Sequence, residues 1–493
     1  MFKHIGYALT TLLVITTLSQ PLKSQTLLWE TNFGGMLNEM GNSCQVLPDS
    51  CIMILGTTYS YGAGLSDIYL VKTDNFGNPL WTRQYGGDST EFGYDMQLTS
   101  DGGFIITGQT TLNKISKDVY LVKVDSSGVT EWEKIFGGFG TDEGRSVRQT
   151  FDKGYIISGT TNSIGNGYND IYLLKTDSLG NLEWEKTFGG AGGETGFASR
   201  QTADSGYVVI GSTGSFGVGY SSIYVIRTDK NGDTLWTNTY GGTKADFGYA
   251  IEVTNDGGLV LVGSTASYGK GESDVYIVKT DPNGNFEWDA VYGGTNDDRG
   301  YSVRELASGN FVITGKTESF TSNIEAYIIM TNPIGLPVWS NYYGGSQTDE
   351  AQAITLDAQG DIIIVGKSFS YSSGGSDVYM LKVKGDQVTD VNEQLLTDLI
   401  PDGFELNQNY PNPFNLSTSI EYSIPSRADV SLTIYNVLGQ VVSYWSEASL
   451  PAGSYRYQWD GTNENGTVVA SGIYLYRIEY GEYSLSKKMV LLK

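Results

Sequence analysis

Short runs of alternating apolar and polar residues follow one another along most of this chain, and turn residues separate them. In residues 144–190 the runs are GRSVRQT, YIISGTT, DIYLLKTD and LEWEKTF, with Gly, Asn and Asp between them. Runs rich in Val, Ile, Tyr and Thr predict β-strands. The intervening DGG and TDxxGN segments predict tight turns, because Gly adopts positive φ and Asp or Asn bonds to the local backbone. The pattern therefore predicts four antiparallel strands and no helix.

The four-strand pattern returns about every 52 residues, and a tryptophan marks each return. Near-copies of the phrase LEWEKTFGG place it at Trp29, Trp81, Trp132, Trp184, Trp236, Trp288 and Trp339. Four antiparallel strands in a repeat of this length are typical of a β-propeller blade. A tyrosine also recurs in every third strand. We expect both aromatic series to pack blade against blade.

The strand count at the two ends predicts how the ring closes. Units containing the first three strands begin near Gly41, Gly93, Gly144, Gly196, Gly248, Gly300 and Ala351. The last unit has no Trp strand after it, whereas the first Trp strand, LLWETNF, precedes every unit. We therefore predict an all-β, seven-bladed propeller over residues 25–386. Its N-terminal strand completes the last blade, so no edge strand is left unpaired.

The N-terminus predicts a secretory signal over residues 1–24. Lys3 precedes an apolar stretch from Ile5 to Leu18, and small and polar residues follow as far as the expected junction at Ser24–Gln25. A membrane anchor is the alternative, but the apolar run is short for a span. We expect no transmembrane segment in the mature chain.

Composition excludes several classes of partner and chemistry. The formal net charge of −24 argues against nucleic acid and anionic membranes as partners, because these need clustered Lys and Arg. The single histidine, His4, lies in the predicted signal, which excludes a Ser-His-Asp triad and a His-bound zinc from the mature chain. Cys44 and Cys51 flank a predicted turn, and a disulfide and two free thiols both remain open.

An acidic residue follows the second Gly of each GG pair by four positions. The seven are Glu39, Glu91, Asp142, Glu194, Asp246, Asp298 and Asp349. Each precedes the first, innermost strand, so we expect them to ring one mouth of the central channel. One interpretation is a cation site, with calcium as the cofactor, because calcium prefers carboxylate oxygens. The alternative is that each carboxylate accepts hydrogen bonds from the Gly-rich crossover.

The loops between the second and third strands should lie on the same face as this ring. They carry apolar or aromatic residues at matching positions, namely Tyr61, Ile164, Phe216, Tyr268, Phe320 and Tyr371. Loops on a rigid scaffold commonly carry function, and the aromatic members are suited to stack on sugars or grip a peptide. The alternative is that they fill gaps between neighbouring blades.

Residues that break the repeat are the place to look for catalysis. Asp95, Arg145, Lys270, Glu272 and Glu325 depart from their equivalents, but they form no recognisable catalytic set. The chain has no phosphate-binding loop, dinucleotide fingerprint or CxxC motif. Paired carboxylates at the channel mouth would suit glycosidic hydrolysis. A mouth lined by aromatics and amides would instead favour binding.

The repeat ends near Lys384, and a second region follows. Residues 387–403 are acidic, lack the repeat and predict a linker. Residues 404–493 hold alternating runs such as VSLTIYNVLGQVV and SGIYLYRI, separated by Asn- and Gly-rich turns. This pattern predicts a small antiparallel β-sandwich.

Five spaced motifs in this region carry a family resemblance. They are NYPNPFN at 409–415, IYNVLGQ at 434–440, WDGTNENG at 459–466, ASGIYLYR at 470–477 and the tail KKMVLL. They closely resemble the type A C-terminal sorting domain of type IX secretion cargo in Bacteroidota and relatives. They are also similar to the immunoglobulin-like domain of flagellar hook-capping proteins. The resemblance implies passage through the periplasm and recognition of residues 404–493 by the type IX machinery.

These patterns together predict a secreted or outer-surface-attached, non-enzymatic propeller. We expect it to present a binding face to carbohydrate, a surface protein or another surface macromolecule. A polysaccharide-acting enzyme that uses carboxylates at the channel mouth is one alternative. A purely structural surface protein is the other.

Overall fold

The computed structural model describes residues 25–111, 116–372, 374–385, 405–415, 417–424, 428–437, 440–450, 453–463, 467–480 and 483–492. Every regular element in these ranges is a β-strand, and the chain divides into two compact units between residues 387 and 388. In the described ranges, no helix is long and apolar enough to cross a membrane. The predicted signal and linker lie outside the described residues.

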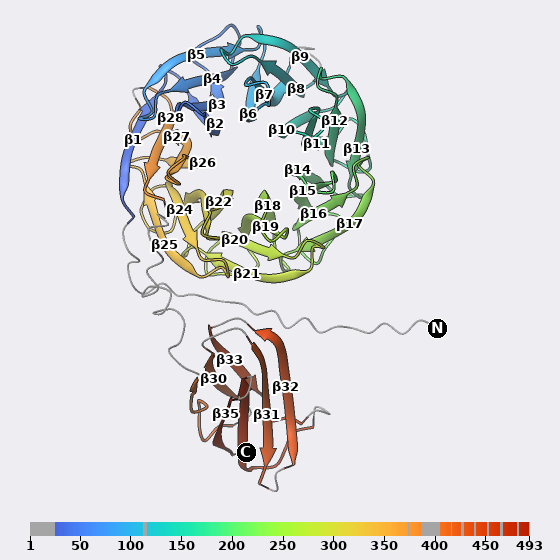
Figure 1. Cartoon of the computed structure of the whole chain (residues 1–493), viewed down its shortest axis with the longest axis vertical. Helices are drawn as coiled ribbons and strands as arrows, with labels where there is room; N and C mark the ends of the chain where they lie inside the picture. Colours follow the sequence, from blue (N-terminus) through green and yellow to red (C-terminus); the bar gives the residue numbers. More distant parts are fainter. Residues whose placement is uncertain are drawn as a thin grey trace. The chain divides into compact units, whose positions relative to one another are not determined.

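The first unit consists of seven four-stranded antiparallel sheets arranged around a ring, as predicted (Figure 1). In each sheet the strand that begins at one of the seven repeated acids, Glu39 and its equivalents, is innermost and the Trp strand is outermost. From the inside outward the blades are β2–β5 (Glu39–Val46, Ile52–Thr58, Asp67–Thr73, Pro79–Tyr85), β6–β9 (Glu91–Leu98, Phe104–Thr110, Asp118–Val124, Thr130–Phe136), β10–β13 (Asp142–Gln149, Tyr155–Thr161, Asp170–Thr176, Leu182–Phe188), β14–β17 (Glu194–Gln201, Tyr207–Thr213, Ser222–Thr228, Thr234–Tyr240), β18–β21 (Asp246–Val253, Leu259–Thr265, Asp274–Thr280, Phe286–Tyr292), β22–β25 (Asp298–Glu305, Phe311–Thr317, Glu325–Thr331, Pro337–Tyr343) and β26–β28 (Asp349–Leu356, Ile362–Ser368, Asp377–Val383) with β1 (Leu27–Phe33).

The two middle strands of each blade form the core. β19 and β20 are buried along their whole length, because neighbouring blades cover both faces of their sheet. This explains why these strands read as nearly continuous apolar runs rather than as a strict alternation. The hydrophobic clusters cross the boundaries between blades. One of them joins Val225 of one blade to Leu261 and Val278 of the next.

The N-terminal strand closes the ring, as predicted. β1 pairs antiparallel with β28, from Leu27 opposite Val383 to Phe33 opposite Val378. The hydroxyl of Tyr379 on β28 donates to Glu30 of β1 at 2.8 Å. Within the fifth blade, Tyr276 makes the same bond to Asp289 at 2.7 Å. β1 therefore supplies the seventh blade with what β21 supplies to the fifth.

The repeated tryptophans contact the following blade. The ring of Trp184 lies 5.9 Å from that of Tyr207 in the next blade, and Trp132 makes the same contact with Tyr155 at 5.8 Å. Trp29 on β1 packs beside Gly77 in a turn of the first blade. Positive φ at Gly77 and the nearby indole both disfavour a larger residue there.

The inner strands differ from the prediction in where they begin. β10 starts at Asp142 rather than Gly144, because Asp142 already pairs with Thr161. A bulge follows between Gly144 and Ser146, and the same irregularity recurs in all seven inner strands. A bulge opposes two residues to one on the partner strand. It brings the adjacent residues Arg145 and Ser146 to the channel wall.

Both cysteines are free thiols, which decides between the two alternatives left open by the sequence. Cys44 lies in the apolar cluster between the first and last blades. Burial raises the pKa of the Cys44 thiol to about 12, against a smaller opposing effect of Arg304. The thiolate is therefore disfavoured at neutral pH.

The second unit is a two-sheet antiparallel sandwich, as predicted. The sheets have the orders β29–β30–β33 and β32–β31–β34–β35. Residues 430–442 read as one run in the sequence, but a turn divides them between two strands. The bounds are β29 Glu405–Leu406, β30 Thr418–Ile424, β31 Ala428–Asn436, β32 Val441–Leu450, β33 Gly453–Trp459, β34 Gly472–Tyr480 and β35 Tyr483–Leu491.

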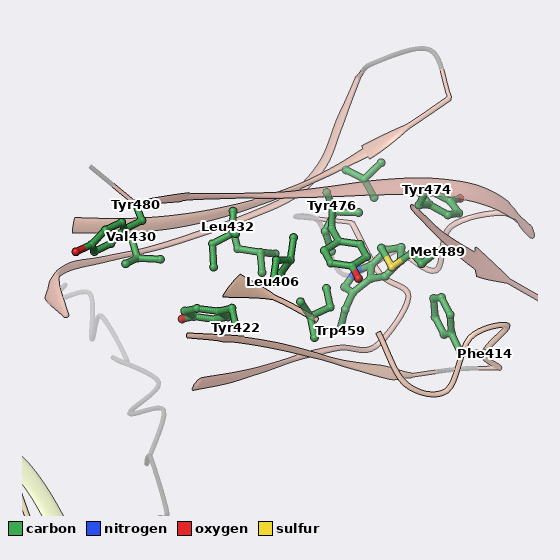
Figure 2. Close-up of a cluster of buried hydrophobic side chains, with 14 of the residues drawn as sticks. Leu406, Phe414, Tyr422, Val430, Leu432, Trp459, Tyr474, Tyr476, Tyr480 and Met489 are labelled. Carbon is green, nitrogen blue, oxygen red and sulfur yellow. The ribbon is translucent and has the colours of Figure 1, made fainter. Parts of the chain in front are cut away.

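The core of the sandwich is built from the motifs that carry the family resemblance (Figure 2). Trp459 of the WDG motif is buried, and its ring lies 5.3 Å from Tyr474 of SGIYLYR and 5.7 Å from Phe414 of NPFN. The hydroxyl of Tyr476 donates to the carbonyl of Asn407 at 2.8 Å. These motifs therefore specify the fold of the domain.

Candidate functional site

The seven predicted carboxylates are buried at the junctions between blades. Each begins an inner strand, and each side chain is fully shielded from solvent. Every one accepts a hydrogen bond from the N–H of the second Gly in its GG pair, as Glu39 does from Gly35 at 2.6 Å and Asp298 from Gly294 at 2.8 Å. Each also accepts from a Ser or Thr hydroxyl, for example Thr58 at 2.8 Å for Glu39. These are the hydrogen bonds from the Gly-rich crossover that the sequence offered as the alternative to a cation site.

A second carboxylate accompanies the first at six of the seven junctions, and the sequence analysis missed these partners. A side-chain carbon on Gly86 would touch both Glu91 and Asp67, and one on Gly344 would touch both Asp349 and Glu325. The partners begin the third strands and are Asp67, Asp118, Asp170, Asp274, Glu325 and Asp377. The sequence does mark these partners, because an acidic residue begins the third-strand run, such as DIYL, in most repeats.

Within the described ranges, no group of three or more His, Cys, Asp or Glu side chains is placed to hold a metal ion. The junctions offer pairs of carboxylates, and some of their oxygens accept no hydrogen bond from the described residues, including Oδ1 of Asp142 and Oδ1 of Asp377. Calcium ligation by the seven repeated acids stays a prediction.

Glu325 provides a measurable consequence of these pairs. Burial, together with repulsion from Asp349, raises the pKa of Glu325 to about 7 from 4.5. Between these two values the folded state binds more protons than the unfolded state, so stability falls as pH rises through this window. Glu325→Gln removes the cost of ionising this buried carboxyl beside Asp349. We therefore expect the variant to be more stable than the unaltered protein by about 2 kcal/mol at pH 8, and about equally stable at pH 4. Thermal melts across this pH range measure the difference.

Glu272→Gln is the matched control, because Glu272 is exposed on a loop. Burial also raises the pKa of Asp67 and Asp274, so part of the pH dependence will persist in Glu325→Gln. A Glu325→Gln protein no more stable than the unaltered protein at pH 8 would contradict the prediction.

The five predicted loop aromatics lie on five different blades and do not converge. Each packs against the repeated tyrosine of its own third strand, as Tyr61 does against Tyr69 at 5.8 Å and Phe216 against Tyr224 at 5.3 Å. The other aromatic members, Tyr268, Phe320 and Tyr371, make the same contact. The hydroxyl of Tyr371 donates to Gly344 of the neighbouring crossover at 2.8 Å. These residues are half exposed, and their binding of a ligand stays a prediction.

The inner strands enclose a cavity of about 230 Å³ in the central channel. Its wall carries four aromatic rings and four amides, and Asp95 is the single acidic residue in it. These aromatics and amides are Tyr94, Phe197, Tyr249 and Tyr301, with Asn42, Gln45, Gln97 and Gln352.

Three of the rings form a continuous row along one side of the cavity. The ring of Tyr249 lies 5.0 Å from Phe197 and 5.5 Å from Tyr301, both in edge-on orientation. The guanidinium of Arg145 lies 4.2 Å above the ring of Tyr94. Such surfaces present aromatic faces and polar donors to a ligand in the channel.

Two of the five repeat-breaking residues belong to the cavity wall, and three do not. Asp95 and Arg145 line the cavity. Lys270 and Glu272 lie between β19 and β20, and Glu325 lies at a blade junction. The aromatic row was not recognised from the sequence, although its signal was a bulky residue directly after the expected strand start.

Comparisons with known proteins match a family model to part of the second unit and find partial relatives of the chain. The family model of the FlgD Ig-like domain matches residues 415–483, which confirms the resemblance of the C-terminal domain to hook-capping proteins. The chain is 29% identical over 273 residues to the regulatory protein FlaEY of Caulobacter vibrioides, covering 49% of this chain and 28% of the relative. It is 20% identical over 419 residues to the uncharacterized WD repeat-containing protein L264 of Acanthamoeba polyphaga mimivirus, covering 65% and 28%.

Among solved structures, Drosophila Plexin A in complex with Semaphorin 1b is similar with a TM-score of 0.44 and 8% identity, over 74% of this chain and 88% of that one. The chain spans little more than a quarter of the length of the two curated relatives. These likenesses concern fold alone.

Proposed function

We propose that this protein is a secreted or surface-attached, non-enzymatic propeller that binds carbohydrate through its central channel. The observation that carries the proposal is the contrast between repeated and non-repeated positions in the inner strands. Positions that hold the ring together, such as the leading acid and the third-strand tyrosine, recur in every blade. The fourth position of the inner strand, which faces the channel, is Asn42, Tyr94, Arg145, Phe197, Tyr249, Tyr301 and Gln352 in turn.

This variation has a physical meaning. A residue needed for blade packing must fit the same surroundings in all seven blades, so it repeats. A channel residue meets no such constraint, and different side chains there make the wall asymmetric. An asymmetric wall is what recognition of one ligand orientation needs, because a few placed polar groups fix that orientation.

The chemistry of the wall favours binding over hydrolysis. Glycosidic hydrolysis uses two carboxylates on either side of the bond. Asp95, the acid of the cavity wall, already accepts bonds from Ser43 at 3.0 Å and from the N–H of Val147 at 3.1 Å, and it pairs with Arg148. Aromatic faces and amides, in contrast, suit the C–H faces and hydroxyls of sugars.

Export through the C-terminal domain is the second part of the proposal. The immunoglobulin-like match covers residues 415–483, and the motifs outside it, NYPNPF and the KKMVLL tail, also resemble type IX cargo. With the predicted signal at residues 1–24, these motifs describe a route through the periplasm to the outer surface. The type IX machinery is the proposed partner of residues 404–493.

A glycan and polysaccharide array probed with the full-length chain tests the binding proposal. We expect binding that Tyr249→Ala weakens by about fivefold or more, the effect of losing one aromatic contact of about 1 kcal/mol. Tyr371→Ala is the matched control, because Tyr371 lies on a blade-junction loop. Loss in Tyr371→Ala with full binding in Tyr249→Ala would instead place the site on the loops. Silence across the array would overturn the proposal.

Running the same array with calcium and with a chelator tests the role of the acids at the blade junctions. Binding lost on chelation would support calcium as a cofactor. Binding that chelation leaves unchanged would assign Glu39 and its equivalents to structure alone. The two results leave the channel proposal intact, because the channel residues are different ones.

A further inference from the structure

Three arginines line the cavity of the central channel. Arg148, Arg200 and Arg304 occupy the same position of their inner strands, β10, β14 and β22, and all three line the cavity. Equivalent positions in neighbouring blades lie side by side along the channel wall, as Arg200 and Arg304 lie on either side of Glu252. The repeat therefore gathers charges that lie about 50 residues apart in the sequence.

These arginines outnumber the carboxylates that neutralise them. Arg148 pairs with Asp95, which three other donors already share. Arg304 donates to an oxygen of Glu252 at 2.8 Å, and Arg200 reaches the same oxygen at 3.3 Å. Three guanidinium groups thus face two carboxylates, and one positive charge is left unmatched.

Arg200 holds most of the unmatched charge. It donates to the carbonyl of Ser199 at 3.0 Å and makes the long contact to Glu252, which together engage two of its five N–H donors. Burial, with repulsion from Arg148, lowers the pKa of Arg200 to about 9, although Glu252 acts in the opposite direction. The arginine stays charged at neutral pH, and an anion beside it would relieve the deficit of negative charge.

The cavity limits which anion fits. Its volume of about 230 Å³ is below the usual range of ligand pockets, about 300–1,000 Å³, so it admits a chain end rather than the middle of a polymer. On β14 and β22 a residue of the aromatic row comes three positions before the arginine, roughly 10 Å along the strand. Ser146 also lines the cavity, and its buried hydroxyl has no hydrogen-bond partner among the described residues.

We infer that the channel binds a glycan end whose terminal sugar carries a carboxylate, a uronic acid, with the carboxylate against Arg148, Arg200 and Arg304. This inference rests on the proposed carbohydrate-binding function and names its ligand class. One unmatched charge suits one carboxylate. The aromatic row favours a sugar over a peptide C-terminus, because it offers ring faces to the pyranose next to the charged group. The net charge of −24 acts against long polyanions and not against a single enclosed anion.

Isothermal titration calorimetry of the full-length chain with cellobiouronic acid, a disaccharide whose terminal glucuronic acid carries its one carboxylate, and with its methyl ester tests the inference. The ester keeps the sugar rings and removes the charge. We expect the acid to bind at least about tenfold more tightly than the ester, as for a charge-assisted hydrogen bond. Equal affinity, or no binding of the acid, would overturn the inference.

Variants separate the arginines from general effects of charge. Arg200→Gln should weaken binding of the acid at least about tenfold and leave binding of the ester unchanged. Arg83→Gln is the matched control, because Arg83 is an exposed arginine that lies over Trp81 on the outer strand β5. If Arg200→Gln does not fold, the comparison of acid with ester on the unaltered protein still decides the question. An unchanged affinity in folded Arg200→Gln would overturn the inference.

Failure of the inference and failure of the proposed function give different results. If neutral glycans bind and the acid and the ester bind with equal affinity, the channel remains a proposed sugar site and the inference of a uronic acid is overturned. If no glycan binds, charged or neutral, both the proposed function and the inference are overturned. A short peptide with a free C-terminal carboxylate and the same peptide with an amidated C-terminus test the other source of a carboxylate. If the free peptide binds, and neither the amidated peptide nor any uronate does, the arginines bind a peptide C-terminus and the inference of a sugar ligand is overturned.

Discussion

Removing residues 25–35 is expected to abolish the cooperative unfolding transition of the propeller. The deletion takes away β1, and with it six residue pairs to β28 and the bond from Tyr379 to Glu30. Each hydrogen bond contributes about 1 kcal/mol net, and the buried β28 would also be left with an unpaired edge. The sum is comparable with the whole stability of a typical domain, about 5–15 kcal/mol. Circular dichroism or calorimetric melts measure the transition.

Leu28→Ser is the control for this deletion, because Leu28 is an exposed residue of the same strand whose replacement keeps the backbone pairing. A deleted protein that melts as cooperatively as the unaltered one, at the same temperature, would contradict closure by β1.

Removing residues 404–493 is expected to leave the propeller folded and to stop its export. In the described ranges this region forms its own sandwich with its own core, and the hydrophobic clusters of the propeller consist of propeller residues. If the region is recognised by the type IX machinery, the shortened protein should accumulate in the periplasm, with at least a tenfold loss from the culture medium or cell surface. Cell fractionation with immunoblotting gives the distribution, and a thermal melt of the retained protein checks its fold.

Lys487→Gln with Lys488→Gln is a finer variant of the same experiment. Both lysines lie in the KKMVLL tail on β35, and the change keeps the strand. Retention in the periplasm with a normal melt would assign the signal to the tail. Normal export of the protein that lacks residues 404–493 would refute the sorting role.

Most of the propeller could be predicted because each strand pattern recurs in all seven repeats. The bounds of β11 and β13 agree with the runs YIISGTT and LEWEKTF to the residue. The start of β10 could not be predicted, because Asp142 joins the ladder through its backbone and no side-chain pattern marks this. The turn inside residues 430–442 was missed, since apolar residues continue on both sides of it.

The candidate site was harder to predict, because it depends on contacts between blades. The sequence located the seven acids but not their buried partners, which come from another strand of the preceding unit, as Asp67 does for Glu91. The contact among the channel arginines could have been predicted from the spacing of charged residues in the sequence. Arg200, Glu252 and Arg304 each lie 52 residues from the next, so charges at one repeat position had to meet if the ring closed.

The pairing of β1 with β28 also determines how the ring responds to mechanical load. Leu27, near the start of β1, lies opposite Val383, at the end of β28, so the two chain ends leave the propeller side by side. Tension applied between them would peel the two strands apart one hydrogen bond at a time rather than shear all of them together. A propeller tethered through its C-terminal region and pulled at its N-terminus would therefore open at this seam first, with the other six blades still intact.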